Sequence, residues 1–98
     1  MMLRMARSVF TLQQQKIVHT DLKLENFLMD NKFYPVLSDF GYAFFIEDFD
    51  NNNIDLQYIT GTKEYLAPEL FKKGKNGKIQ YSFKSDIYSL GVCFFYLL

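Results

Sequence analysis

The feature that most constrains this sequence is an apolar segment at its C-terminal end. Residues 92–98 are all apolar, and Ile87 and Leu90 extend the pattern at helical spacing. Ser85 is a suitable N-cap, and Asp86 places an acidic side chain in the first turn, so we expect the helix to begin there. Such a helix is apolar around most of its circumference, which means that it needs neighbours on most sides. The segment therefore predicts a central helix in a larger assembly.

A second helix is predicted near the N-terminus. Apolar side chains recur at helical spacing through residues 2–14, and neither Gly nor Pro interrupts them. This pattern predicts one buried face, which includes Val9 and Phe10. Ile17 and Val18 follow as a short β-branched pair, which favours an extended conformation.

The middle of the chain has the pattern of a short hairpin followed by loops. Two apolar runs, 27–29 and 34–37, flank the turn residues 30–32, so a hairpin is expected. Residues 47–57 are acidic and rich in Asn, and they predict a mobile loop. A short helix is expected over 67–73.

Pro68 is compatible with the first turn of that short helix. Residues 74–77 then predict a loop, and the basic stretch 72–78 is interpreted as its solvated surface. The predicted fold class is α+β, with two main helices and short β-hairpins.

Composition places the chain among folded proteins and excludes several partners. Hydrophobic residues make up 49% of the 98 residues and aromatic residues 18%, whereas disordered chains combine low hydrophobicity with high net charge. The formal net charge is zero, so no extended field attracts nucleic acid or an anionic membrane. We therefore expect no nucleic-acid partner.

The cysteine content, the histidine content and the hydropathy of the sequence bear on its cellular location and on metal binding. Cys93 is the single cysteine of the sequence, so it cannot form an intramolecular disulfide, which fits a reducing compartment. His19 is the single histidine, which argues against a histidine-based metal cluster. No segment reaches the roughly 20 apolar residues of a membrane span, and residues 1–7 lack a signal-peptide core. We expect an intracellular, cytoplasmic location without a membrane span.

Chemistry-bearing side chains gather in residues 19–26. Asp21, Lys23 and Asn26 stand at steps of two and three on a predicted loop between two short strands. A carboxylate can accept a proton, an ammonium can neutralise phosphate charge, and an amide oxygen can ligate a hard cation. Taken alone, such a cluster is more often an ordinary polar loop than a functional site. Three further clusters follow, at residues 38–41, 61–69 and 86–92.

Taken in order, the four clusters resemble the signature of eukaryotic protein kinases. They match the catalytic loop H-R-D-L-K-x-x-N, the triplet D-F-G, the segment G-T-x-x-Y-x-A-P-E and the helix start D-x-W-S-L-G. The resemblance covers essentially the whole chain. It implies a partial kinase domain over 1–98, mainly the helical large lobe, with the catalytic loop at 19–26. The activation segment would then span 39–69, and the central helix would begin at about 85.

The resemblance assigns a role to each polar residue of the loops. It implies that Asp21 is the catalytic base, that Lys23 lies near the transferred phosphate of ATP, and that Asn26 and Asp39 ligate Mg²⁺. Thr62 resembles the residue that packs against this Asp and Lys in serine/threonine kinases. The implied activity is transfer of the γ-phosphate of ATP to Ser or Thr of a protein substrate.

Other residues are assigned to the scaffold on the same basis. His19 is expected to pack beside Phe40 rather than to act as a base. Glu69 resembles a buried acid whose arginine partner lies outside this sequence. An unpaired carboxylate is costly to stability if it is buried. Asp86 is expected to accept backbone N–H bonds from the catalytic loop, and we predict that these bonds lower its pKa.

The sequence also departs from the family pattern. Thr20 stands where most kinases have the arginine that binds a phosphate on the activation loop. Control of activity by phosphorylation of that loop is therefore less expected. Tyr58, Thr60 and Thr62 remain candidate phosphate acceptors. Tyr88 replaces a tryptophan.

The glycine-rich loop and the nucleotide-contacting lysine of the small lobe do not occur in the chain. We therefore expect the isolated chain to be inactive. Three hypotheses stay open: a piece of an active serine/threonine kinase, a pseudokinase-like binding or regulatory module without catalysis, and an incomplete chain with no function of its own.

Overall fold

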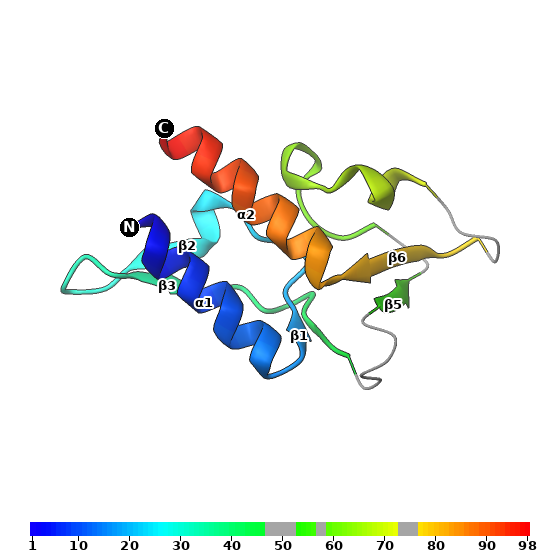
Figure 1. Ribbon diagram of the computed structural model, residues 1–98, viewed down its shortest axis with the longest axis horizontal. Coiled ribbons are helices and arrows are strands. Elements are labelled where there is room, and N and C mark those ends of the chain that lie inside the picture. Colours follow the sequence, from blue (N-terminus) through cyan, green and yellow to red (C-terminus); the bar gives the residue numbers. More distant parts are fainter. Residues whose placement is uncertain (47–52, 57–58, 73–76) are drawn as a thin grey trace.

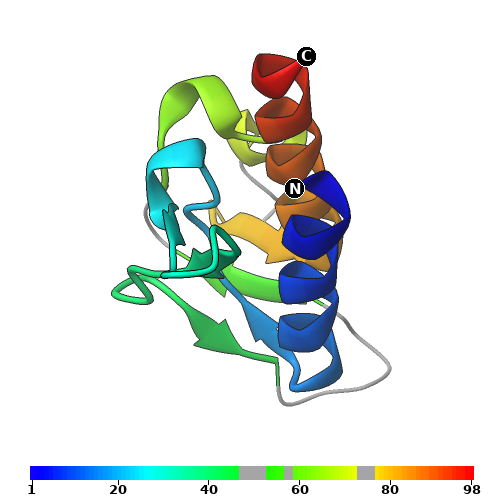
Figure 2. The ribbon, with the colours of Figure 1, turned by 90° about the vertical axis from the view of Figure 1, so that its left-hand side faces the viewer.

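Two antiparallel helices form one side of the molecule, and three short strand pairs form the other. The computed structural model describes residues 1–46, 53–56, 59–72 and 77–98. Helices α1 (Met2–Gln14) and α2 (Phe83–Leu97) lie side by side and run in opposite directions (Figures 1 and 2). Both chain termini lie at the same end of this helix pair.

The strands form three separate two-stranded antiparallel units among the described residues. Strand β1 pairs with β4, β2 with β3, and β5 with β6. Between them lie three 3-10 turns, η1, η2 and η3. The bounds are β1 (Ile17–Val18), η1 (Leu24–Asn26), β2 (Phe27–Met29), β3 (Pro35–Leu37), β4 (Phe44–Phe45), β5 (Asn53–Leu56), η2 (Lys63–Tyr65), η3 (Pro68–Phe71) and β6 (Ile79–Ser82). The predicted α+β class is confirmed.

Helix α1 has the bounds that its periodicity predicts. Met5, Val9 and Leu12 are buried on one stripe, as side chains three and four residues apart should be. The prediction for Phe10 was wrong, because this side chain is 57% exposed. Phe10 follows Val9 by one position, a rotation of about 100° that takes it off the buried stripe.

The hairpin β2–β3 confirms the predicted turn. Phe27 lies opposite Leu37, and Met29 lies opposite Pro35. The turn is stabilised by Asp30, whose Oδ1 accepts the backbone N–H groups of Lys32 and Tyr34 at 2.8 and 2.9 Å. Asp at a turn start makes such local bonds readily.

The pair β5–β6 was not foreseen. Residues 53–56 belong to the segment predicted as a loop, but they form a strand whose partner is β6. The rest of that predicted loop, residues 47–52 and 57, lies outside the described residues, as do 73–76 of the basic stretch. The helix predicted over 67–73 is a shorter 3-10 turn, η3.

Helix α2 begins earlier than predicted. Its N-cap is Ser82, and Ser85 is the third helical residue rather than the cap. The Ser82 backbone N–H donates to Ser85 Oγ at 3.1 Å, and Ser85 Oγ donates to the Ser82 carbonyl at 2.6 Å. Two serines three residues apart both suit a cap, and the reciprocal bonding selects the first.

Two buried clusters hold the elements together. The first joins α1, the loop after β1 and α2, and its members are Met5, Val9, Leu22, Tyr65, Leu90 and Cys93. The second lies beneath β1, η3 and β6, and its members are Val18, Ile46, Leu66, Ala67, Leu70, Ile79 and Tyr81. Val18 of β1 belongs to the second cluster and Leu22 of the following loop to the first, so the two clusters together fix the position of the loop between β1 and β2.

The outer side of α2 is exposed and apolar. Leu90 and Cys93 are buried against α1 and the loop, whereas Phe95 is 74% exposed and Leu98 is 93% exposed. This agrees with the prediction that α2 requires neighbours on most sides. Within the part of the chain that the structure describes, neither helix has the length and apolarity that crossing a bilayer demands.

Candidate functional site

The loop that follows β1 is anchored by a carboxylate at the start of α2. Asp86 Oδ2 accepts the backbone N–H of His19 at 2.7 Å, and Asp86 Oδ1 accepts that of Thr20 at 3.1 Å. Asp86 is only 2% exposed. The expected backbone bonds are therefore confirmed, and they tie together segments more than 60 residues apart in the sequence.

The two backbone bonds lower the pKa of Asp86 as predicted, but the net shift is upward, contrary to the expectation of a lowered pKa. Burial outweighs the two backbone N–H bonds and raises the pKa of this carboxyl from 3.8 to about 6. Desolvation disfavours the charged form, and the donors from His19 and Thr20 offset only part of that cost.

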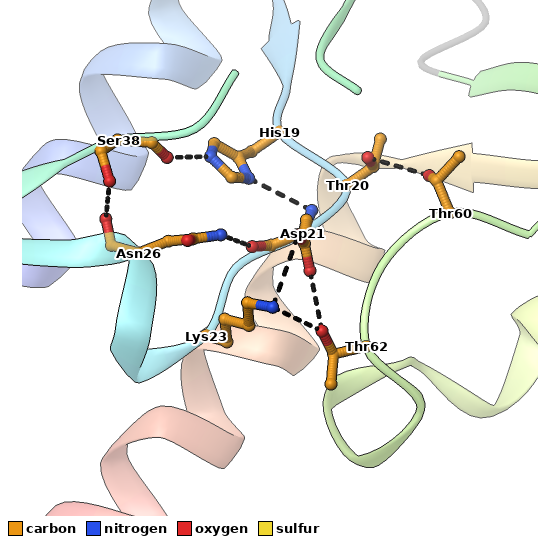
Figure 3. A network of polar contacts seen from close by, with 8 residues as sticks. All are labelled: His19, Thr20, Asp21, Lys23, Asn26, Ser38, Thr60 and Thr62. Atoms are coloured by element: carbon orange, nitrogen blue, oxygen red, sulfur yellow. Dashed lines mark hydrogen bonds and ion pairs between the residues drawn. The ribbon is translucent and has the colours of Figure 1, made fainter. Parts of the chain in front are cut away.

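The His19 ring joins two backbone segments through its two nitrogen atoms. Its Nε2 donates to the Ser38 carbonyl at 2.9 Å, and its Nδ1 accepts the Asp21 backbone N–H at 3.1 Å (Figure 3). Because the carbonyl can only accept, these bonds specify the tautomer with the proton on Nε2. The ring lies edge-on to Phe40 with centroids 5.0 Å apart. The expectation of a packed histidine beside Phe40 is confirmed.

Asp21, Lys23 and Thr62 form a polar triangle at the centre of the site (Figure 3). Thr62 Oγ1 donates to Asp21 Oδ1 at 3.1 Å and accepts from Lys23 Nζ at 3.0 Å. Lys23 Nζ also lies 3.9 Å from Asp21 Oδ2. The contact predicted for Thr62 is confirmed, and it brings the loop before η2 against the loop after β1.

Asn26 links Asp21 to the end of β3. Its Nδ2 donates to the Asp21 carbonyl at 2.8 Å. Its own carbonyl accepts the Ser38 backbone N–H at 2.8 Å and Ser38 Oγ at 3.0 Å. Because the amide nitrogen donates to Asp21, Oδ1 is the acceptor atom that remains on the Asn26 side chain.

Asp39 lies apart from the triangle, directly after Ser38. It is exposed, and its φ of +59° places it in the left-handed region, which Asp tolerates better than most residues. The structure thus unites Asp21, Lys23 and Asn26, and it joins Asp39 to them through the backbone of Ser38. Asn26 and Asp39 both present oxygen donors, the type that Mg²⁺ prefers, so the donor set fits this ion.

A chain of hydroxyls that the sequence did not reveal connects Thr20 to β6. Thr20 Oγ1 donates to the Tyr42 carbonyl at 3.1 Å and accepts from Thr60 Oγ1 at 2.9 Å. Tyr81 OH accepts the Thr60 backbone N–H at 2.8 Å and donates to the Thr60 carbonyl at 2.6 Å. The residues are 20 or more positions apart, so no local pattern signals the network.

Thr20 is held in a strained conformation by these contacts. Its φ is +73°, which is unusual for a β-branched residue. Strain of this kind persists only where surrounding contacts enforce it, and it is concentrated at functional sites. Here the backbone bond to Asp86 and the side-chain bonds to Tyr42 and Thr60 enforce it.

Gly61 allows the loop before η2 to approach the Thr20 carbonyl. Its φ is +105°, and a Cβ at this position would lie 2.5 Å from the Thr20 oxygen.

The expected burial cost of Glu69 does not arise in this structure, because Glu69 is exposed.

Comparisons with known proteins agree with this geometry. The sequence model described as "Protein kinase domain" matches residues 1–98. Serine/threonine-protein kinase 32C of Mus musculus is 38% identical over 94 residues, which are 96% of this chain and 18% of the relative. Cysteine-rich receptor-like protein kinase 10 of Oryza sativa subsp. japonica is 44% identical over 79 residues, 81% of this chain and 11% of the relative.

The chain therefore belongs to the protein kinase domain family. It spans less than a fifth of the length of these two relatives.

Proposed function

We propose that residues 19–26 are the catalytic loop of a serine/threonine protein kinase, residues 39–69 its activation segment, and residues 1–98 part of its large lobe. The observation that carries the proposal is the triangle of Asp21, Lys23 and Thr62, in which one hydroxyl bridges a carboxylate and an ammonium. Asp86 and His19 fix the backbone of the loop that carries Asp21, through hydrogen bonds to the N–H groups of residues 19–21. The ATP-gripping small lobe lies outside these residues.

The reaction is transfer of the γ-phosphoryl group of ATP to a Ser or Thr hydroxyl of a protein. The substrate oxygen forms a bond to the γ-phosphorus while the bond to the β–γ bridging oxygen breaks and ADP leaves. Asp21 accepts the hydroxyl proton, and Thr62 keeps the carboxylate oriented for that role. Lys23 stabilises negative charge on the transferred phosphoryl group.

Asn26 and Asp39 are the residues that would hold Mg²⁺. The ion supplies charge neutralisation on the phosphate oxygens when it is bound. The commitment of Asn26 Nδ2 to the Asp21 carbonyl supports this assignment, because it fixes which end of the amide is available. The resemblance at Lys23 and Thr62 supports Ser or Thr, rather than Tyr, as the acceptor, and the reducing chemistry implied by a lone cysteine supports an intracellular location.

The test is Mg²⁺-ATP-dependent phosphorylation of casein by the full-length protein. Asp39→Asn should abolish phosphorylation, because it removes a metal-ligating carboxylate without changing side-chain size. Asp30→Asn is the matched control, because Asp30 lies in the β2–β3 turn and asparagine retains the oxygen that accepts the turn bonds. We expect its activity to equal that of the unaltered protein.

The 98-residue chain alone is expected to be inactive, because phosphoryl transfer depends on positioning by both lobes. Full-length protein that neither binds ATP nor phosphorylates casein would contradict the proposal and would identify a non-catalytic binding module.

A further inference from the structure

A basic hollow lies between α1 and β3, outside the triangle of Asp21, Lys23 and Thr62. Its volume is about 230 Å³, and it is lined by Arg4, Arg7, Ser8, Thr11, Tyr34 and Pro35. The four helix residues recur at steps of three and four, so they share one face of α1, which adjoins the buried stripe and turns toward β3. No acidic side chain lines the hollow, and α1 itself contains none.

The two guanidinium groups are not neutralised within the described residues. No carboxylate of the described part of the chain lies within ion-pair distance of Arg4 or Arg7. The hollow therefore carries the positive charges of two guanidinium groups.

Arg4 is preorganised for an anion. Its Cζ lies 3.5 Å from the centroid of the Tyr34 ring, so the ring holds the face of the guanidinium. The N–H donors of a guanidinium lie in its plane, and stacking leaves them available for a planar or tetrahedral oxyanion.

The two hydroxyl residues of the lining, Ser8 and Thr11, bond to the backbone of α1. Ser8 Oγ donates to the Arg4 carbonyl at 3.0 Å, and Thr11 Oγ1 donates to the Arg7 carbonyl at 2.9 Å. Their protons are thus committed to the helix backbone, so the arginines alone offer charged donors to a ligand.

We propose that this hollow binds a phosphorylated side chain of a peptide segment. A phosphoserine carries about −1.5 to −2 charges at pH 7, which matches two arginines better than one carboxylate does. Exposed apolar side chains adjoin the lining residues in the sequence, with Leu3 68% exposed and Phe33 79% exposed. They offer contact area to a peptide that a free ion would not use. The zero net charge of the chain gives no extended field for an anionic bilayer.

The test is titration calorimetry of the full-length protein with capped peptides. The probe carries one phosphoserine between alanine and leucine residues, and matched peptides carry serine or glutamate instead. Inorganic phosphate and phosphatidylserine-containing vesicles are the other two arms. We expect saturable binding of the phosphopeptide and at least about tenfold weaker binding of the other two peptides, because several charge-assisted hydrogen bonds are lost.

Arg7→Glu should weaken phosphopeptide binding by at least about tenfold, because it reverses one of the two charges. Lys84→Glu is the matched control, an exposed lysine on α2 with the same change of charge, and it should change affinity by less than about twofold. Asp39→Asn should leave this binding intact, so failure of the catalytic proposal and failure of this one are distinguishable.

Five outcomes would overturn the proposal. The first is no saturable binding, and the second is equal binding by the Arg7→Glu variant. Equal affinity for the glutamate peptide or for inorganic phosphate would assign the hollow to carboxylates or to the free ion. Binding of vesicles without binding of the phosphopeptide would assign it to lipid.

Discussion

Thr60 Oγ1 donates a hydrogen bond of 2.9 Å to Thr20 Oγ1, which joins the proposed activation segment to the proposed catalytic loop through two neutral hydroxyls. Thr20 occupies the position at which the family pattern has an arginine. An arginine there would need an anionic partner, whereas a threonine finds its partner in the unmodified chain. The connection is therefore complete without a phosphate.

Thr20→Val should loosen this connection while keeping the β-branched shape. The variant loses the bonds to Thr60 Oγ1 and to the Tyr42 carbonyl, each worth about 1 kcal/mol. We expect faster amide hydrogen exchange at Thr60 and Thr62 and a kcat reduced about tenfold. Thr11→Val, on an exposed face of α1, is the control. Unchanged exchange at Thr60 would show that the hydroxyl pair does not hold the segment.

Phosphatase treatment should leave the kinase activity of the full-length protein nearly unchanged. The hydroxyls of Thr60 and Thr62 are already bonded to Thr20, Asp21 and Lys23 in the unmodified chain. We expect kcat to fall by less than about twofold, in contrast to kinases whose segment is ordered by a phosphate. Mass spectrometry would verify removal of phosphate, and complete loss of activity would contradict the prediction.

Thr62→Val should impair chemistry more than nucleotide binding. The variant removes the hydroxyl that donates to Asp21 and accepts from Lys23. We expect kcat to fall about tenfold or more, with the KM for ATP nearly unchanged, because the bridge orients groups that act in the transition state. Thr62→Ser restores the hydroxyl and should recover most of the activity. Equal kcat in the valine and serine variants would rule out the orienting role.

The Asp86 carboxyl should titrate with a midpoint near pH 6. Burial raises its pKa from 3.8 to about 6, so between these values the folded protein holds a proton that the unfolded chain releases. Its contribution to the free energy of unfolding therefore falls as pH rises through this window, by about 3 kcal/mol in total.

Carbon-13 NMR of the Asp86 carboxyl measures the midpoint directly, and Asp86→Asn identifies the resonance. In denaturant unfolding, this variant should lack the part of the pH slope that Asp86 supplies. A midpoint at or below 3.8 would show that the two backbone donors outweigh burial.

Gly61→Ala should destabilise the contact between the activation segment and the catalytic loop. The new Cβ would lie 2.5 Å from the Thr20 carbonyl oxygen, which is fixed backbone, and the φ of +105° is unfavourable for alanine. The conformation alone costs about 1–3 kcal/mol. We expect a lower thermal midpoint and reduced kcat. Gly91→Ala is the control, because open space surrounds that position in α2, and it should be neutral or stabilising. Equal thermal midpoints for the two variants would contradict the close approach.

Local sequence was sufficient for the elements whose contacts are local. The periodicity of residues 2–14 predicted α1, and Asp30 with its neighbours predicted the β2–β3 turn, because each depends on side chains within a few positions. The order of the four motifs was sufficient for the family. It also led to the contact of Thr62 with Asp21 and Lys23 and to the bonds from the loop to Asp86.

The tertiary structure alone decided the remaining features. Strand β5 exists because β6 supplies its hydrogen bonds, and residues 53–56 taken singly favour a loop. Tyr81 reaches Thr60 across 21 positions, and Thr60 reaches Thr20 across 40. The pKa of Asp86 rises because the packed chain excludes water from it. Pairing between distant segments and desolvation are properties of the assembled chain, so the sequence determined which groups were present and the fold decided what they meet.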